Sequence, residues 1–128
     1  MEINELKKKL NYLIKQREKC EKVIFNRDVI LEGVYREFYK VCGRKNCWCY
    51  QGEKKHGPYH KIEVIREGKQ KVYIIPKSKV PEVIELYNNR KEFLEAESKI
   101  KSINEEIYEV IKGIKKLKEK RADKRWLK

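Results

Sequence analysis

The sequence has no apolar run that approaches the length of a membrane span. Its first five residues, Met1 to Glu5, are typical of neither a secretory signal nor a transit peptide. Threonine is absent, while lysine, glutamate and isoleucine are abundant, a bias typical of hyperthermophiles or of AT-rich genomes. We therefore expect a soluble, cytoplasmic protein that does not associate with membranes.

Patterns that mark common active sites are absent as well. The sequence contains no HExxH, no phosphate-cradling glycine-rich loop and no Ser-His-Asp arrangement. With 128 residues, the chain has room for one domain with a modest core. We therefore expect that the protein is not an enzyme.

Two long helical patterns make up most of the chain. Apolar residues recur at alternating spacings of three and four between residues 3 and 31, and no glycine or proline interrupts them before Gly33. A second helix is predicted to begin near Ser78 and Pro81. Its seam has Leu86, Phe93, Ile100, Ile107 and Ile114 at one heptad position and Ala96, Ile103, Val110 and Leu117 at the other. This pattern predicts a coiled coil, and an ordinary amphipathic helix is the alternative for the first segment.

Between the helices, three cysteines and a histidine fall within fifteen residues: Cys42, Cys47, Cys49 and His56. Thiolate and imidazole ligands suit a tetrahedral zinc ion. A disulfide is disfavoured in a reducing compartment, and Cys47 and Cys49 are poorly placed to bridge each other. We therefore predict a structural Zn2+ site, with a disulfide or redox role and unliganded thiols as the alternatives.

His60 is an alternative to His56 as the fourth ligand. We prefer His56 because His-Gly-Pro-Tyr is typical of a turn, whereas His60 begins an alternation typical of a strand. The remaining cysteine, Cys20, lies alone in the first helical pattern and is expected to be a small apolar core residue.

The predicted fold class is α+β, with two long antiparallel coiled-coil helices flanking a small zinc-stabilised three-stranded β-module. A strand over residues 33–41 and a hairpin of residues 59–66 and 70–75 supply the module. We expect four parts: an N-terminal coiled-coil helix at 1–32, the zinc-binding module at 33–76, a long C-terminal coiled-coil helix at 77–120 and a frayed basic tail at 121–128.

The two predicted helices differ in length. Measured back from the module, the first helix would end opposite about residue 106, yet the seam of the second continues through Ile107, Val110, Ile114 and Leu117. Because these apolar groups would need another partner, we predict a homodimer through the long C-terminal helix.

The charge is uneven: 33 basic against 20 acidic residues give a net charge of +13. Residues 33–76 contain ten basic and four acidic residues, and residues 112–128 contain nine and two. Such an excess favours a polyanion, and we predict nucleic acid, with DNA ahead of RNA. The candidate contacts are Arg44, Lys45, Trp48, Lys54 and Lys55 in the module and Lys112, Lys115, Lys116, Lys118, Lys120, Arg121, Lys124 and Arg125 near the C-terminus. Trp48 has two interpretations, a base-stacking ring or a cover over the zinc core.

The segment from about residue 32 to 95 resembles a family of small archaeal and bacterial proteins. The shared features are Cys-Gly-Arg-Lys-Asn-Cys-Trp-Cys at 42–49 and His-Gly-Pro-Tyr at 56–59, with Arg44 where the family usually has lysine. The resemblance implies that the three cysteines and His56 act as one unit. It also implies a DNA-related setting near transposases and other mobile elements.

Two functions follow from these observations. The first is a non-enzymatic, zinc-stabilised nucleic-acid-binding protein that serves as a regulator or accessory of mobile elements or chromatin. The second is an adaptor that presents the zinc module to another protein or to a ribonucleoprotein, such as a polymerase, a transposase or the ribosome.

Overall fold

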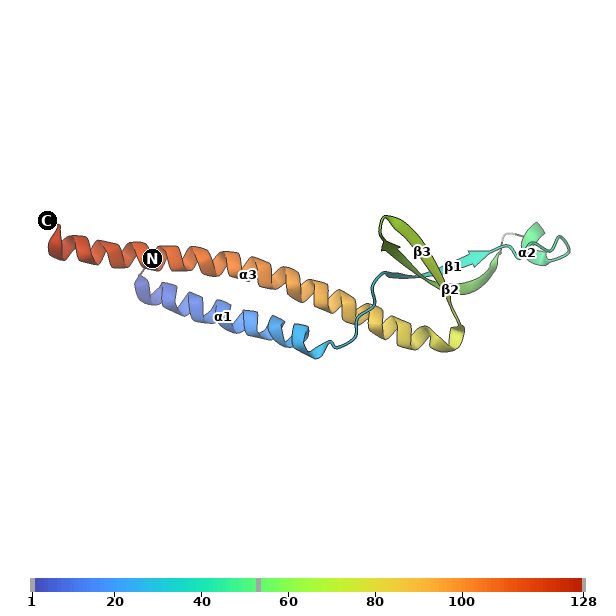
Figure 1. Ribbon diagram of the computed structural model, residues 1–128, viewed down its shortest axis with the longest axis horizontal. Helices are drawn as coiled ribbons and strands as arrows, with labels where there is room; N and C mark the ends of the chain where they lie inside the picture. The colour runs from blue at the N-terminus through green and yellow to red at the C-terminus, as the bar shows by residue number, and fades with distance from the viewer. Residues whose placement is uncertain (1, 53, 128) are drawn as a thin grey trace. The chain divides into compact units, whose positions relative to one another are not determined.

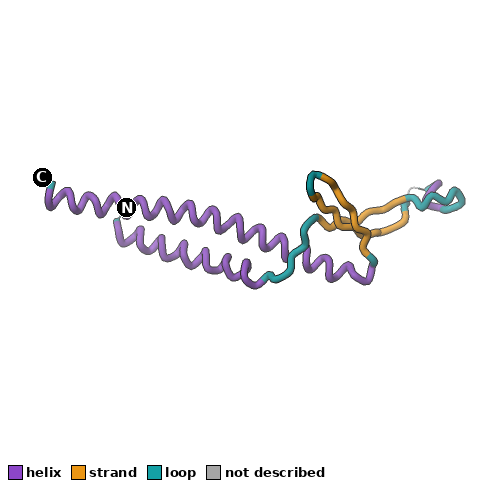
Figure 2. Tube along the Cα trace, in the orientation of Figure 1, coloured by secondary structure: helices purple, strands orange, loops and turns teal. Residues whose placement is uncertain are grey.

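The computed structural model describes residues 2–52 and 54–127 and is mixed helix and strand, as predicted. Its elements are α1 (Ile3–Asn26), β1 (Val34–Lys40), α2 (Trp48–Gln51), β2 (His56–Arg66), β3 (Lys69–Ile75), a 3-10 turn (Lys77–Lys79) and α3 (Val80–Trp126) (Figures 1 and 2). The chain forms two compact units: a helical unit of residues 1–28 and 92–128, and a β-unit of residues 29–91. No helix within the described ranges is long and apolar enough to span a membrane.

The core of the helical unit lies where α1 and the later turns of α3 run side by side (Figures 1 and 2). Leu13 of α1 is buried against Ile107 and Val110 of α3. Partly buried aliphatic side chains surround this centre: Leu6, Leu10, Ile14, Ile103 and Ile114. The residues of α3 in this core are therefore all seam residues identified from the sequence.

Contacts between α1 and α3 extend further along α3 than the sequence predicted. Arg17 donates a hydrogen bond to Asn104 (3.0 Å), and a methyl group of Leu6 lies 3.2 Å from the position that a Cβ would take on Gly113. The prediction that the first helix ends opposite residue 106 is therefore wrong.

Two features account for this difference. Asn26 and Asp28 favour non-helical backbone, and α1 stops at Asn26 instead of continuing to residue 31. The extended residues that follow meet α3 several residues after its start, where the N–H of Leu31 donates to the carbonyl of Leu86. The prediction instead aligns the end of the first helix with the start of the second.

This coverage removes the reason given for a homodimer. Ile107 and Val110, which were expected to need a second copy of the chain, are buried within the helical unit. The homodimer therefore stays a prediction without that support.

The β-unit is built on an antiparallel sheet with the strand order β1-β2-β3. Tyr35, Ile62 and Tyr73 lie opposite one another across the three strands. Their face of the sheet contains the buried Ile62 and Val64, and the ring of Tyr35 lies 6.5 Å from that of Tyr87 in α3. This face therefore packs toward the first turns of α3.

The C-terminal segment is helical beyond the predicted boundary. α3 continues to Trp126, so residues 121–126, predicted as a frayed tail, form its last turns. No glycine or proline follows Gly113, and Lys124 and Arg125 in the last turn complement the negative end of the helix dipole. Lys128 lies outside the described residues.

Candidate metal centre

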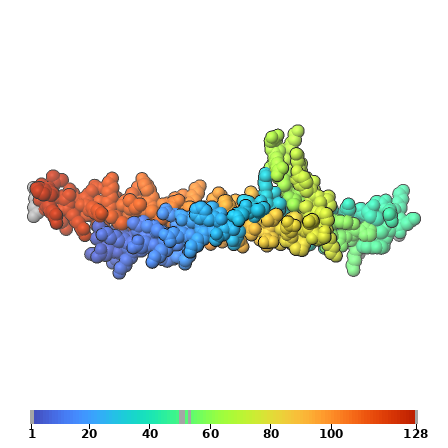
Figure 3. Space-filling view, turned by 60° about the horizontal axis from the view of Figure 1, so that its bottom comes forward, coloured from blue at the N-terminus to red at the C-terminus, as the bar shows by residue number. Residues whose placement is uncertain are grey.

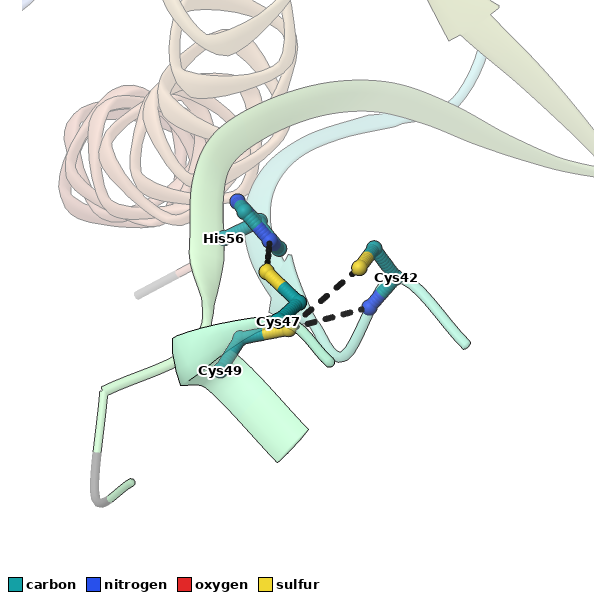
Figure 4. A group of neighbouring side chains, drawn as sticks. All are labelled: Cys42, Cys47, Cys49 and His56. Atoms are coloured by element: carbon teal, nitrogen blue, oxygen red, sulfur yellow. Dashed lines mark hydrogen bonds between the residues drawn. The ribbon is translucent and has the colours of Figure 1, made fainter. Parts of the chain in front are cut away.

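The four predicted ligands come from both ends of one loop and from the short helix inside it. Cys42 follows β1, Cys47 precedes α2, Cys49 lies in α2 and His56 begins β2 (Figure 4). Lys40 pairs with His56 across the β1–β2 ladder, past a bulge that follows Phe38. The sheet therefore brings the two ends of the loop together.

The geometry of these four side chains suits a single metal ion. The Cys47 sulfur lies 3.0 Å from Nε2 of His56, and the Cys49 sulfur lies 3.5 Å from the Cys42 sulfur. All four potential ligand atoms lie within 4.8 Å of one another. In a tetrahedral site with metal–sulfur bonds of about 2.3 Å, neighbouring sulfurs are about 3.8 Å apart. The predicted group is thus brought together as one cluster that could hold a metal ion.

The sulfurs of the cluster differ in their electrostatic surroundings. A hydrogen bond from the backbone N–H of Arg44, reinforced by contacts with the other three side chains of the cluster, lowers the pKa of Cys42 to about 6. Burial raises the pKa of Cys49, whose side chain is among the most enclosed in the protein. The backbone N–H of Cys42 also donates to the Cys49 sulfur (3.4 Å). Backbone donors of this kind stabilise the thiolate form that binds metals.

His60, the alternative to His56, lies outside this cluster and has a different partner. Its Nδ1 lies 2.6 Å from the hydroxyl of Tyr35, and the two rings are stacked with centroids 5.9 Å apart. Burial raises the pKa of Tyr35, with the charge of Glu37 as a smaller cause. The cluster contains His56, the preferred histidine, although His56 is the first residue of β2 and not part of a turn.

Gly57 explains how His56 can approach β1 so closely. Its φ of +142° is in a region that side chains rarely adopt, and an added Cβ would lie 2.9 Å from the carbonyl oxygen of Phe38 and 2.7 Å from the ring of Tyr39. A glycine at this position therefore allows the strand pairing that brings His56 to the cysteines.

The predicted nucleic-acid contacts of the β-unit lie close to the cysteines and His56 in the sequence. Arg44, Lys45, Lys54 and Lys55 are exposed. The ring of Trp48 lies 4.8 Å from that of His56, yet 57% of the residue is accessible to solvent. The two interpretations of Trp48 are thus compatible, since the ring contacts a candidate ligand and leaves most of its surface open.

The other predicted contacts lie on α3 in the helical unit. All are exposed: Lys112, Lys115, Lys116, Lys118, Lys120, Arg121, Lys124 and Arg125. Lys112 lies 3.5 Å from a carboxylate oxygen of Glu109 and over the ring of Tyr108. Side-chain exposure agrees with a role in binding a polyanion, but it is equally typical of any solvated helix face.

Two features were not found from the sequence. The Tyr35–His60 pair depends on the strand register, which brings residues 25 positions apart into contact. Cys20, expected in a core, is only half-buried and lines a groove between α1 and α3 together with Val23, Ala96 and Ile103. Helical periodicity placed Cys20 on the correct face but could not show how closely the helices approach each other there.

Comparisons with known proteins give no match: no family model fits the chain, and neither the curated proteins nor the solved structures contain a similar one. The resemblance to the archaeal and bacterial family therefore stays an expectation drawn from the cysteine and His-Gly-Pro-Tyr motifs.

Proposed function

We propose that the protein is a zinc-stabilised nucleic-acid-binding protein. The observation that carries the zinc assignment is the convergence of three sulfurs and one imidazole nitrogen within 4.8 Å. This donor set is typical of zinc, and four protein ligands leave no open position for a substrate, as in structural sites. Cys42, Cys47, Cys49 and His56 would hold the ion, which supplies a cross-link between β1, α2 and β2.

The small core of the β-unit supports a structural role for the metal. Among its described residues, only Cys49, Ile62 and Val64 are buried apolar side chains. A unit of this size seldom folds on so few buried groups, and a metal cross-link offsets the deficit.

We also propose that the helical unit is an antiparallel coiled coil. Ala96, Ile103, Val110 and Leu117 are spaced by seven residues, and Leu6, Leu13 and Cys20 of α1 have the same spacing. The contacts support an antiparallel arrangement of α1 and α3. Arg27, just after the C-terminal end of α1, pairs with Glu92, and Leu6, near the N-terminal end of α1, lies beside Gly113.

The nucleic-acid assignment is supported by the positions of the charges. Ten basic against four acidic residues in 33–76, and nine against two in 112–128, form two basic segments on either side of an acidic half of α3. Their exposed lysines and arginines can neutralise phosphates without reading sequence. A DNA-related role near mobile elements would agree with the resemblance, and DNA is therefore the first ligand to test.

The test is binding of the zinc-loaded protein to duplex DNA, single-stranded DNA and structured RNA over a range of salt concentrations. We expect affinity to fall steeply as salt rises. Replacing Lys118, Lys120 and Lys124 by glutamine should weaken binding about uniformly across sequences. The matched control replaces Lys91, Lys99 and Lys101, which lie on the acidic half of α3. Absence of binding to every nucleic acid in low-salt buffer would refute the proposal.

One observation favours an adaptor as a second candidate. Ile65, Val72 and Ile74 lie on the same face of the sheet, and they are 73%, 50% and 64% exposed. A group of exposed β-branched side chains is more typical of a protein-binding surface than of a phosphate-binding one. A specific protein that co-purifies after nuclease treatment, and that is lost when Ile65 and Ile74 are replaced by serine, would favour this function.

A further inference from the structure

We propose that Trp48 is a stacking platform for an unpaired base, so that the β-unit prefers single-stranded nucleic acid to duplex. This inference rests on the proposed function and specifies the form of nucleic acid that the segment between β1 and β2, called the metal loop below, would bind. It starts from the exposure of Trp48, which is 57% accessible, whereas its neighbour Cys49 is 2% accessible. An exposed aromatic ring offers a face on which an unpaired base can stack.

The metal ligands on either side of Trp48 hold its backbone. Cys47 and Cys49 both belong to the ligand cluster, so one ion would fix the chain before and after the tryptophan. The ring also contacts His56, with centroids 4.8 Å apart and planes inclined by 50°. A ring that is already ordered loses little conformational entropy when a base stacks on it.

Cationic residues lie close to Trp48 in the sequence. Arg44 and Lys45 are exposed and line a shallow surface pocket with Asn46 and Cys47. Between residues 38 and 62 the sequence has six basic residues and one acidic residue. Three thiolates and one divalent ion together carry a single negative charge, so the loop stays positive when the metal is bound. An exposed aromatic ring within a positively charged segment is a combination that single-strand binders use.

The space-filling view shows this loop as a lobe at the end of the sheet away from the β2–β3 turn (Figure 3). A base stacked within a duplex has both of its faces covered by neighbouring bases. The free energy needed to unstack two neighbouring base pairs is about as large as the free energy gained from one base–aromatic stacking contact. A single tryptophan therefore gains little by inserting into paired DNA. An unpaired base requires no such opening, and the ring should therefore select single strands.

Fluorescence provides a direct test, because the chain has only two tryptophans. In a Trp126→Phe variant, all tryptophan emission comes from Trp48. The zinc-loaded full-length protein would be titrated with an oligothymidylate and an oligouridylate of ~12 nucleotides and with a mixed-sequence duplex of similar length. We expect strong quenching by the single strands and little by the duplex. Equal quenching by the duplex would overturn the preference, since it would indicate a wedge.

Affinity measurements complete the test. Trp48→Ala should weaken single-strand binding by about ten-fold, Trp48→Phe should retain most of the affinity, and duplex binding should not change. The control is Tyr12→Ala, which removes a 61% exposed ring of α1. Native mass spectrometry verifies that each variant holds one metal ion. Unchanged single-strand affinity of a metal-loaded Trp48→Ala protein would refute the stacking role while leaving the proposed function intact. Failure of the parent protein to bind any nucleic acid would refute both.

Discussion

The Cys47 sulfur and Nε2 of His56 are 3.0 Å apart, although Cys47 directly precedes α2 and His56 begins β2. The other histidine, His60, is hydrogen bonded to Tyr35 and lies outside the cluster. The two histidines therefore have different surroundings, one in the cluster that could hold a metal ion and one in the sheet.

Substitution should distinguish the roles of the two histidines. His56→Ala should lower zinc affinity by at least ten-fold, because it removes one of four ligands. His60→Ala should leave a stoichiometry of one zinc per chain and lower only the stability of the sheet. Native mass spectrometry and competition with a chromophoric chelator measure both quantities. Loss of zinc from the His60 variant alone would show that the ligand assignment is wrong.

Metal removal should affect the two units of the chain differently. The β-unit has few buried apolar groups, whereas the helical unit has a continuous core around Leu13. Chelation under reducing conditions should therefore increase amide hydrogen exchange across β1, β2 and β3 and leave α1 protected. Hydrogen exchange followed by mass spectrometry measures each segment within the intact protein. Unchanged protection of the sheet after chelation would contradict a structural role for the ion.

The cluster of three cysteines and His56 could be predicted from the sequence because its determinants are local. Three cysteines and a histidine within fifteen residues can converge with few alternatives, and soft ligands at such spacing suggest zinc without knowledge of the fold. The position of each histidine depends on a bulge after Phe38 and on the hydrogen bond between His60 and Tyr35, and both follow from the strand register.

The extent of the helices was harder to predict for a different reason. A heptad pattern identifies the buried face, and it correctly selected Ile107 and Val110. The same pattern continued past Asn26 because the weak preferences of Asn26 and Asp28 for non-helical backbone are small beside an apolar repeat. The prediction also aligned the end of the first helix with the start of the second, whereas Leu31 bonds to Leu86, and this offset changes which residues of α3 are covered by α1.

Glu63 should make the stability of the sheet depend on acid pH. A hydrogen bond from Lys61 (2.9 Å), together with Arg36 (3.1 Å), lowers the pKa of the Glu63 carboxyl. An acid whose pKa is lower in the folded state stabilises the fold above its ordinary pKa, and this stabilisation is lost as the pH falls through the folded-state pKa.

Glu63→Gln should therefore lower the stability of the fold at neutral pH. Between about pH 5 and pH 3, the variant should lose less additional stability than the parent protein does. Denaturant titrations at several pH values, followed by circular dichroism, measure this difference. Glu85→Gln, at an exposed position of α3, provides the control. Release of metal at low pH lowers the stability of all these proteins, so the comparison depends on differences between variants. Parallel pH profiles for the parent and Glu63→Gln would contradict the prediction.

Leu13 should be the residue of α1 whose truncation costs the most stability. It is 4% exposed and packs against Ile107 and Val110, so Leu13→Ala removes buried methyl groups and leaves a cavity. We expect a loss of about 2–4 kcal/mol, measured by thermal or urea unfolding of the helical signal. Tyr12→Ala is the matched control, since its ring is 61% exposed and its loss should cost less than about 0.5 kcal/mol. Sedimentation at several concentrations would show whether either variant changes the molecular mass. Similar small effects of the two substitutions would mean that α1 does not pack on α3 along the seam centred on Leu13.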